Sequence, residues 1–153
     1  MSNLQQAEQL KQFMEEIFEV SKDFWAAQSK TKSKNEADIT ETEFLALDML
    51  SKSDHPLTVG DIQKRIGVLP AQMSRVIRSL ESKGGHPLIA CRINPVDKRK
   101  VDVEITPAGR KNHQDYRQMK LGTIEKTLRC LSEQDRGEFM RILRQIRENV
   151  RKA

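Results

Sequence analysis

Apolar residues near the middle of the chain recur at helical spacing and predict two short helices. The first helix has an apolar side made of Val59, Ile62 and Ile66. Thr58 and Asp61 have the spacing of a capping box, which places the start of this helix at Thr58. Gly67 is expected to end it, because glycine readily adopts the left-handed conformation found after helices.

The second short helix is predicted from Pro70 to about Ser82, since proline suits the first position of a helix. Its apolar side consists of Met73, Val76, Ile77 and Leu80. Its other side consists of Ala71, Gln72, Arg75, Arg78, Ser79 and Ser82. A helix that buries aliphatic residues and exposes glutamine and arginine is suited to contact a negatively charged partner.

Two strand-like segments follow these helices. They are residues 88–93 and residues 101–105, and the second alternates apolar and acidic residues. Residues 94–100 (NPVDKRK) connect them and contain three basic side chains. Two helices followed by a two-stranded hairpin with a basic tip make a winged helix-turn-helix.

A long helix is predicted at residues 4–28. Its apolar face consists of Leu10, Phe13, Met14, Ile17, Val20 and Phe24, widened by Phe18 and Trp25. This face is broader than a helix needs to pack on one small domain, so we expect it to contact a helix of a second chain. The alternative is an ordinary core helix.

A polar loop and a central helix come next. Residues 29–38 lack apolar periodicity and predict a loop with solvated lysines, with contact to DNA as the alternative. Thr40 and Glu43 form a second capping box and start a helix that extends to Lys52. This helix is apolar on most sides, so we expect it to lie centrally, behind the two short helices.

Two more helices are predicted after the hairpin. Thr106 caps the first, which runs from Pro107 to about Cys130, and Ser132 caps the last. The last helix has an apolar face made of Phe139, Ile142, Leu143, Ile146 and Val150. A small central domain cannot cover such faces.

Two segments resemble signatures of a known family. Residues 74–84 (SRVIRSLESKG) look like the recognition helix of the MarR family of bacterial regulators. Residues 97–109 (DKRKVDVEITPAG) resemble that family's wing, an Asp-x-Arg followed by a strand and a Leu/Ile-Thr-x-x-Gly. The chain departs from the family at Leu69, where a hydroxyl cap is common, and at residues 85–87, which are inserted before the first wing strand.

The resemblance implies a mainly α fold with a small β-wing. The winged helix-turn-helix would cover residues 40–105, with dimerisation helices at residues 1–30 and 106–153. We expect these parts to form a single domain, residues 1–153. The expected dimer contacts are Leu10, Phe13, Ile17, Phe139, Ile142 and Ile146.

The charge of the chain is uneven and changes sign along it. Residues 1–56 hold 6 basic and 11 acidic side chains, residues 57–111 hold 11 and 5, and residues 112–153 hold 10 and 6. Positive charge is therefore highest on the segment with the winged helix-turn-helix pattern. This distribution is typical of proteins that bind duplex DNA, although charged helix faces are often merely solvated.

Composition argues against several other classes. Hydrophobic residues make up 37% of the chain and charged residues 32%, as in a soluble helical protein. No apolar run approaches the length of a membrane span and no signal peptide opens the chain, so we expect a cytoplasmic protein with no membrane partner. No catalytic motif is present, so we expect no enzyme.

The cysteines and histidines suggest neither a metal nor a cofactor. Cys91 and Cys130 are too few for a disulfide framework or a zinc pattern. Some MarR relatives sense oxidants through a cysteine, often in the first helix, but residues 1–56 contain none. We expect both thiols to be inert. His55, His86 and His113 lack partners at ligand spacing.

The candidate DNA contacts lie on the second short helix and on the wing. On the helix, glutamine suits adenine and arginine suits guanine, whereas a serine more often contacts phosphate. On the wing, arginine suits a narrow minor groove and lysines suit phosphates. The candidates are Thr58, Gln72, Ser74, Arg75, Arg78, Lys98, Arg99 and Lys100. The resemblance implies that Asp97 holds a neighbouring arginine in place.

These patterns predict a sequence-specific regulator that binds double-stranded DNA as a homodimer on a pseudo-palindromic operator. We expect a repressor that occludes a promoter and is released by a small-molecule effector. Candidates for the effector pocket are Trp25, Phe44, His113 and Tyr116, with ordinary core or surface positions as the alternative. The alternative is a winged-helix protein-interaction module, which would need neither the recognition-helix arginines nor Arg99.

Overall fold

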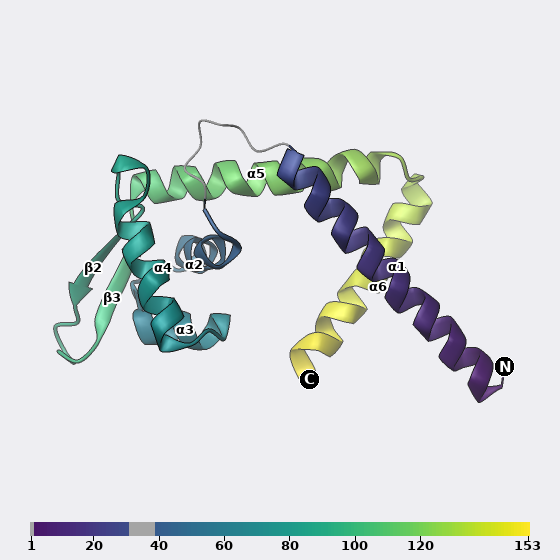
Figure 1. Cartoon of the computed structure of the whole chain (residues 1–153), viewed down its shortest axis with the longest axis horizontal. Coiled ribbons are helices and arrows are strands. Elements are labelled where there is room, and N and C mark those ends of the chain that lie inside the picture. Colours follow the sequence, from purple (N-terminus) through teal and green to yellow (C-terminus); the bar gives the residue numbers. More distant parts are fainter. Residues whose placement is uncertain (1, 31–38) are drawn as a thin grey trace. The chain divides into compact units, whose positions relative to one another are not determined.

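The structure is a computed structural model, and it describes residues 2–30 and 39–153. Its elements in chain order are α1 (Asn3–Lys30), α2 (Glu41–Lys52), β1 (Leu57–Thr58), α3 (Val59–Ile66), α4 (Pro70–Ser82), the short 3-10 helix η1 (Lys83–Gly85), β2 (Ile89–Ile93), β3 (Val101–Ile105), α5 (Pro107–Arg129) and α6 (Glu133–Lys152) (Figure 1). The predicted fold class, mainly α with a small β-wing, is confirmed.

The chain forms two compact units. The head unit is Lys32–Gln118, and the terminal unit is Met1–Thr31 together with Met119–Ala153. Helix α5 is continuous and contributes residues to both units.

Both predicted capping boxes are present. Thr40 Oγ1 accepts a hydrogen bond from Glu43 N at 3.2 Å, and Glu43 Oε2 accepts one from Thr40 N at 3.1 Å. The equivalent bonds between Thr58 and Asp61 measure 3.1 and 3.3 Å. Each box satisfies two backbone N–H groups at the start of its helix, which explains why α2 and α3 begin where the sequence predicts.

The predicted ends of several other helices are also confirmed. Gly67 follows α3 with φ of 78°, in the left-handed region. Pro70 opens α4, and Leu69 before it provides no side-chain cap. Helix α1 continues through Ser29 and Lys30, two residues that we expected to lie in a loop. The rest of that predicted loop, residues 31–38, lies outside the described residues.

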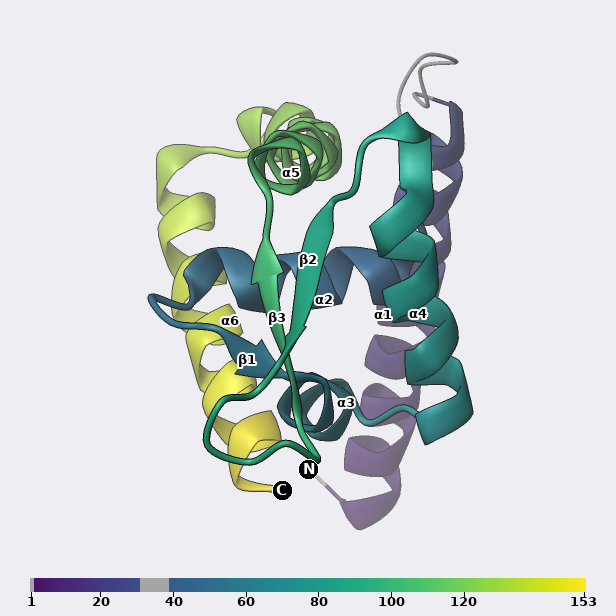
Figure 2. The same ribbon diagram turned by 90° about the vertical axis from the view of Figure 1, so that its left-hand side faces the viewer.

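The sheet has three strands, so the prediction of a two-stranded hairpin was incomplete. The strand order is β1-β3-β2, and both pairings are antiparallel, with Leu57 opposite Val103 and Cys91 also opposite Val103 (Figure 2). Strand β1 is only two residues long and therefore shows no alternation in the sequence.

The core of the head unit lies between this sheet and helices α2, α3 and α4. Figure 2 shows α2 passing behind the strands, the central position that we expected for it. The fully buried side chains with the largest volumes are Leu47, Ile62, Met73, Leu80, Ile89 and Val103. Because these residues come from α2, α3, α4, β2 and β3, the core fixes the wing and α4 on one scaffold.

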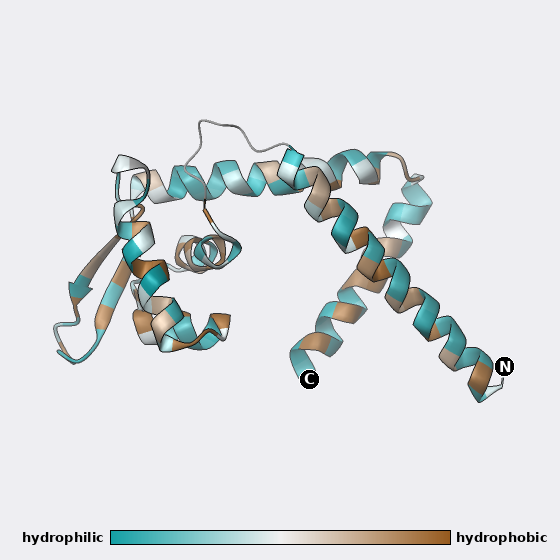
Figure 3. Cartoon of the chain, in the orientation of Figure 1, coloured by the Kyte–Doolittle hydropathy of each residue, from teal (hydrophilic) through white to brown (hydrophobic). Residues whose placement is uncertain are grey.

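The apolar faces of α1 and α6 are largely exposed. In α1 and α6, both described along their full lengths, no residue is buried. Figure 3 shows hydrophobic residues recurring along both helices. Large side chains that remain exposed include Leu10, Phe13, Ile17, Phe139, Ile142 and Ile146, with exposed fractions from 39% to 66%.

None of the helices in the described part of the chain is long and apolar enough to cross a membrane.

Candidate nucleic-acid interface

Helix α4 presents a polar side because its aliphatic side is held in the core. Met73, Val76 and Leu80 are buried. Helical periodicity then directs the intervening residues outward. The candidate contacts Gln72, Ser74, Arg75 and Arg78 are all exposed.

Arg78 contacts the backbone of its own helix. Its Nε donates a hydrogen bond to the carbonyl oxygen of Ser74 at 3.3 Å. This contact is exposed and is readily exchanged for a contact with another acceptor.

An open cleft of about 790 Å³ lies between the start of α3, helix α4 and the wing. Its lining includes Thr58, Lys64, Ser74, Arg78, Arg99 and Lys100. Five of these six residues are among the sequence candidates. Lys64 was not predicted from the sequence. The sequence shows it only as a lysine near the end of a short helix, which does not distinguish it from other surface lysines. The pKa of Asp61, which also lines the cleft, is lowered by a hydrogen bond from the Thr58 side chain.

The turn at the tip of the wing is organised by Asn94. Its Oδ1 accepts hydrogen bonds from the backbone N–H groups of Val96 and Asp97, both at 2.9 Å. Its Nδ2 donates to Asp102 Oδ1 at 2.9 Å. Asp102 is only 8% exposed, although the alternation along this strand directs it away from the apolar side. The sequence reading missed both residues.

Asp97 and Arg99 form the next part of this network. Arg99 donates from Nε to Asp97 Oδ1 at 3.1 Å and from Nη2 to Oδ2 at 3.2 Å. The backbone N–H of Arg99 also donates to Asp97 Oδ1 at 3.1 Å. The hydrogen bond from the Arg99 side chain lowers the pKa of Asp97. The contact that the sequence reading expected is therefore present, and its role in DNA binding stays a prediction.

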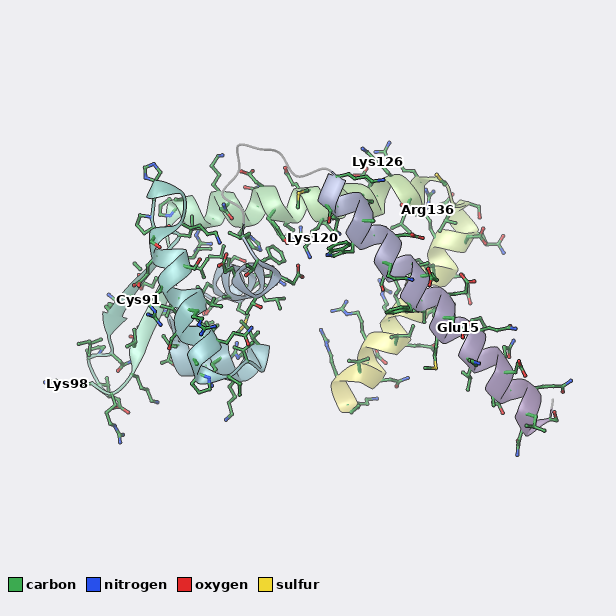
Figure 4. The ribbon with its side chains drawn as sticks, in the orientation of Figure 1. Glu15, Cys91, Lys98, Lys120, Lys126 and Arg136 are labelled. Carbon is green, nitrogen blue, oxygen red and sulfur yellow. The ribbon has the colours of Figure 1, made fainter. Side chains whose placement is uncertain are left out.

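The two lysines that flank Arg99 are exposed. Lys98 lies at the tip of the hairpin (Figure 4), and Lys100 lies at the edge of the cleft. Another wing cation, Arg92, donates from Nη2 to Glu104 Oε1 at 3.0 Å on the neighbouring strand. In the wing, Arg92 is therefore paired with an acidic residue of the neighbouring strand, whereas the lysines at the tip are exposed.

The segment between α4 and the wing, residues 83–87, folds against the head. Gly85 has φ of 75°, a conformation that residues with a side chain rarely adopt. Leu88 N donates to Leu80 O at 2.8 Å, and Thr106 Oγ1 donates to Pro87 O at 2.6 Å. The additional residues before the wing are therefore held at the C-terminal end of the segment.

The environment of Cys91 disfavours its thiolate form. Burial, together with a hydrogen bond to Glu81, raises the pKa of Cys91 to about 12. Figure 4 places Cys91 on the wing strand, beside α4. Cys130 is exposed and not paired in a disulfide. A thiol with a raised pKa is a poor nucleophile, so Cys91 is not activated in this structure.

Three of the four pocket candidates lie together. The ring of Phe44 stacks on that of His113, with centroids 5.2 Å apart, and its centroid is 4.7 Å from that of Tyr116. His113 is buried, and its Nε2 donates to Asp48 Oδ1 at 2.8 Å. Trp25 lies on α1, in the terminal unit.

The pairing of His113 with Asp48 was not foreseen, because the two residues are 65 positions apart in the sequence. Burial raises the pKa of Asp48, but hydrogen bonds from Lys52 and His113 outweigh this effect and lower it. Within residues 2–30 and 39–153, no three His, Cys, Asp or Glu side chains form a group able to hold a metal ion.

Comparison with known proteins agrees with this geometry. Residues 39–101 match the sequence pattern described as "MarR family". An uncharacterized HTH-type transcriptional regulator of Bacillus subtilis (strain 168), YdgJ, is 26% identical over 112 residues. The alignment spans 73% of this chain and 66% of YdgJ, just under two thirds of that relative.

Solved structures share the fold over most of the chain. The YusO protein from Bacillus subtilis has a TM-score of 0.72 at 20% identity, and the match covers 97% of this chain and 99% of YusO. BpsR from Bordetella bronchiseptica, whose DNA binding is regulated by 6-hydroxynicotinic acid, has a TM-score of 0.65 at 22% identity. That match covers 88% of this chain and 98% of BpsR.

Proposed function

We propose that this chain, a member of the MarR family of winged helix-turn-helix transcriptional regulators, binds a specific site in double-stranded DNA and so controls transcription. One observation carries the proposal. A helix whose aliphatic side is buried presents Gln72, Arg75 and Arg78 to solvent, in the same unit as a hairpin with an exposed basic tip.

The exposed side chains of α4 would read bases in the major groove. Gln72 suits adenine, and Arg75 and Arg78 suit guanine, because each can form paired hydrogen bonds with that base. Ser74, like Thr58 at the start of α3, would contact phosphate and so position the helix without specifying a base.

The wing would contact DNA beside the major-groove site. Arg99 is suited to a narrow minor groove, where A·T tracts concentrate negative potential. Lys98 and Lys100 would neutralise phosphates. Asp97 would act indirectly, by orienting the Arg99 guanidinium through two hydrogen bonds.

We further propose that the protein acts as a homodimer on a pseudo-palindromic operator. The support is the exposed apolar faces of α1 and α6, whose large side chains gain a favourable environment when a second copy covers them. Two copies of α4 would then read half-sites about one helical turn of DNA apart, roughly 34–36 Å.

Repression and release by an effector complete the proposal. A dimer bound over a promoter would exclude the transcription machinery, and a small rotation of the two copies of α4 would break their register on the duplex. A ligand effect on DNA binding is known for BpsR, which shares this fold. The Phe44, His113 and Tyr116 cluster is the candidate place for the effector to act.

The second class of function is a winged-helix module that binds proteins. Nothing in that class requires the exposed arginines of α4 together with Arg99, so we place DNA binding first. We propose neither catalysis nor a cofactor, and we propose a cytoplasmic location.

A gel-shift experiment tests the proposal. The purified full chain is titrated against the duplex that flanks its own gene and against a random duplex of equal length, with and without small aromatic acids. We expect a discrete complex on the flanking duplex at a much lower protein concentration than on the random one. Equal affinity for both duplexes, tried over the whole flanking region, would contradict specific DNA binding.

A further inference from the structure

A partly buried ion pair joins the end of α4 to the start of α2. Lys83 Nζ lies 2.6 Å from Glu43 Oε2, and the side chains are 22% and 5% exposed, respectively. The two residues are 40 positions apart in the sequence. Lys83 is the C-cap residue of α4, and Glu43 is the third residue of α2.

Each member of the pair has a second partner that fixes its position. Glu43 Oε2 also accepts the hydrogen bond from Thr40 N at 3.1 Å, so the carboxylate is part of the cap of α2. Lys83 Nζ also donates to Ser79 Oγ, one turn back in α4, at 3.4 Å. The ammonium group is therefore held between the two helices.

Among the residues that the structure describes, the opposite end of α4 has no ion pair and no side-chain cap. Leu69 precedes the helix and provides no side-chain hydrogen bond to it. Along its length α4 is held by aliphatic contacts of Met73, Val76 and Leu80. Such contacts are not directional, so they limit small rotations about the helix axis less sharply than an ion pair at the end of the helix does.

We infer that Glu43 and Lys83 are a positioning pair that fixes the rotation of α4 and thereby sets DNA specificity without contacting a base. The inference rests on the proposed function. Recognition helices read bases with their N-terminal residues, so the C-terminal end of α4 is free to be held by the scaffold. Breaking the pair is costly, because it leaves the buried carboxylate of Glu43 without its partner charge, and this cost favours one orientation of the helix.

The first test uses Lys83→Met, which removes the ammonium group and keeps an unbranched side chain. Its matched control is Lys111→Met, which removes one positive charge from an exposed lysine of the same unit. We expect Lys83→Met to lose about tenfold in affinity for the cognate duplex, the size of one lost base contact. Affinity for random DNA should fall no further than in the control.

The second test uses the sign of an electrostatic effect. Glu43→Gln removes a negative charge, which by Coulomb's law alone should tighten binding to every duplex. If Glu43 positions α4 through Lys83, Glu43→Gln should instead bind the cognate duplex more weakly. Lys83→Arg keeps the pair and should retain the wild-type ratio of cognate to random affinity, whereas Lys83→Gln should not.

Thermal melting first shows which variants are folded. The DNA affinities of the folded variants are then compared at a temperature well below their melting transitions. Glu43→Gln and Lys83→Gln provide the test if Lys83→Met does not fold. If all folded variants keep the wild-type ratio of cognate to random affinity, the pair is only structural and the inference is wrong. If the wild type itself shows no preference for the cognate duplex, the proposed function has failed instead.

Discussion

The carboxylate of Asp97 binds the guanidinium of Arg99 through two hydrogen bonds, Nε to Oδ1 at 3.1 Å and Nη2 to Oδ2 at 3.2 Å. The Arg99 side chain is 91% exposed and that of Asp97 is 29% exposed. Solvent screens such a pair, so it contributes little to stability. Its effect is geometric, because a carboxylate that accepts from two guanidinium nitrogens fixes the plane of the arginine.

Replacing Asp97 with alanine should therefore weaken DNA binding, although the change removes a charge that repels phosphate. Affinity for the cognate duplex is measured over a range of salt concentrations. Asp54→Ala is the control, since it removes an acidic side chain that is 97% exposed elsewhere in the head unit. Tighter binding by Asp97→Ala at every salt concentration would mean that Asp97 acts only as a repelling charge.

Arg75→Ala should reduce specificity. Loss of a bidentate contact to guanine should cost about 1–3 kcal/mol on the cognate duplex and much less on random DNA. Fluorescence anisotropy with both duplexes measures the difference, and Arg110→Ala, at the start of α5, is the control for loss of one positive charge. Equal losses on the two duplexes would reassign Arg75 to a phosphate contact.

Removing Lys98 and Lys100 together should reduce the salt dependence of binding. Each phosphate neutralised by a lysine releases counterions, so the slope of log affinity against log salt should flatten by about one to two per subunit. An unchanged slope in the double lysine variant would place both lysines away from phosphates.

Arg99→Ala should instead weaken binding most on sites with A·T-rich flanks, where the minor groove is narrow.

Charged residues on the apolar face of α6 should prevent dimer formation. Ile142→Glu with Ile146→Glu is expected to give a monomer or insoluble protein, because a dimer interface would have to bury both carboxylates. Sedimentation velocity at micromolar concentration measures the outcome, with Gln145→Glu as the control off the apolar face. If the wild type sediments as a monomer under these conditions, the proposed dimer is wrong.

Gly109→Ala should destabilise the head unit. An added Cβ would lie 2.0 Å from the carbonyl oxygen of Leu88 and 2.8 Å from Cγ1 of Ile105. A backbone oxygen cannot move aside easily, so the free energy of unfolding should fall by about 1–3 kcal/mol, as for other overpacked sites. In Gly60→Ala, the added Cβ would meet only Thr58 Oγ1 at 3.8 Å, so that variant should keep its stability in a denaturant titration.

The sequence alone determined the features that depend on neighbouring residues. The capping boxes at Thr40 and Thr58, the left-handed Gly67 and the opening Pro70 all act within one turn of a helix, and each is found where the sequence predicts it. The period of 3.6 residues likewise identified which side of α4 is buried. Interactions of this kind involve only neighbouring residues, so they can be predicted without knowledge of the rest of the fold.

The tertiary structure decided the features that join distant segments. Strand β1 is recognisable only by its pairing with β3, and Asp102 is buried because Asn94, across the hairpin, supplies its partner. The pairs Glu43–Lys83 and Asp48–His113 connect residues 40 and 65 positions apart. A buried charge needs a partner, but periodicity and spacing cannot tell which distant residue the packing of the core will place beside it.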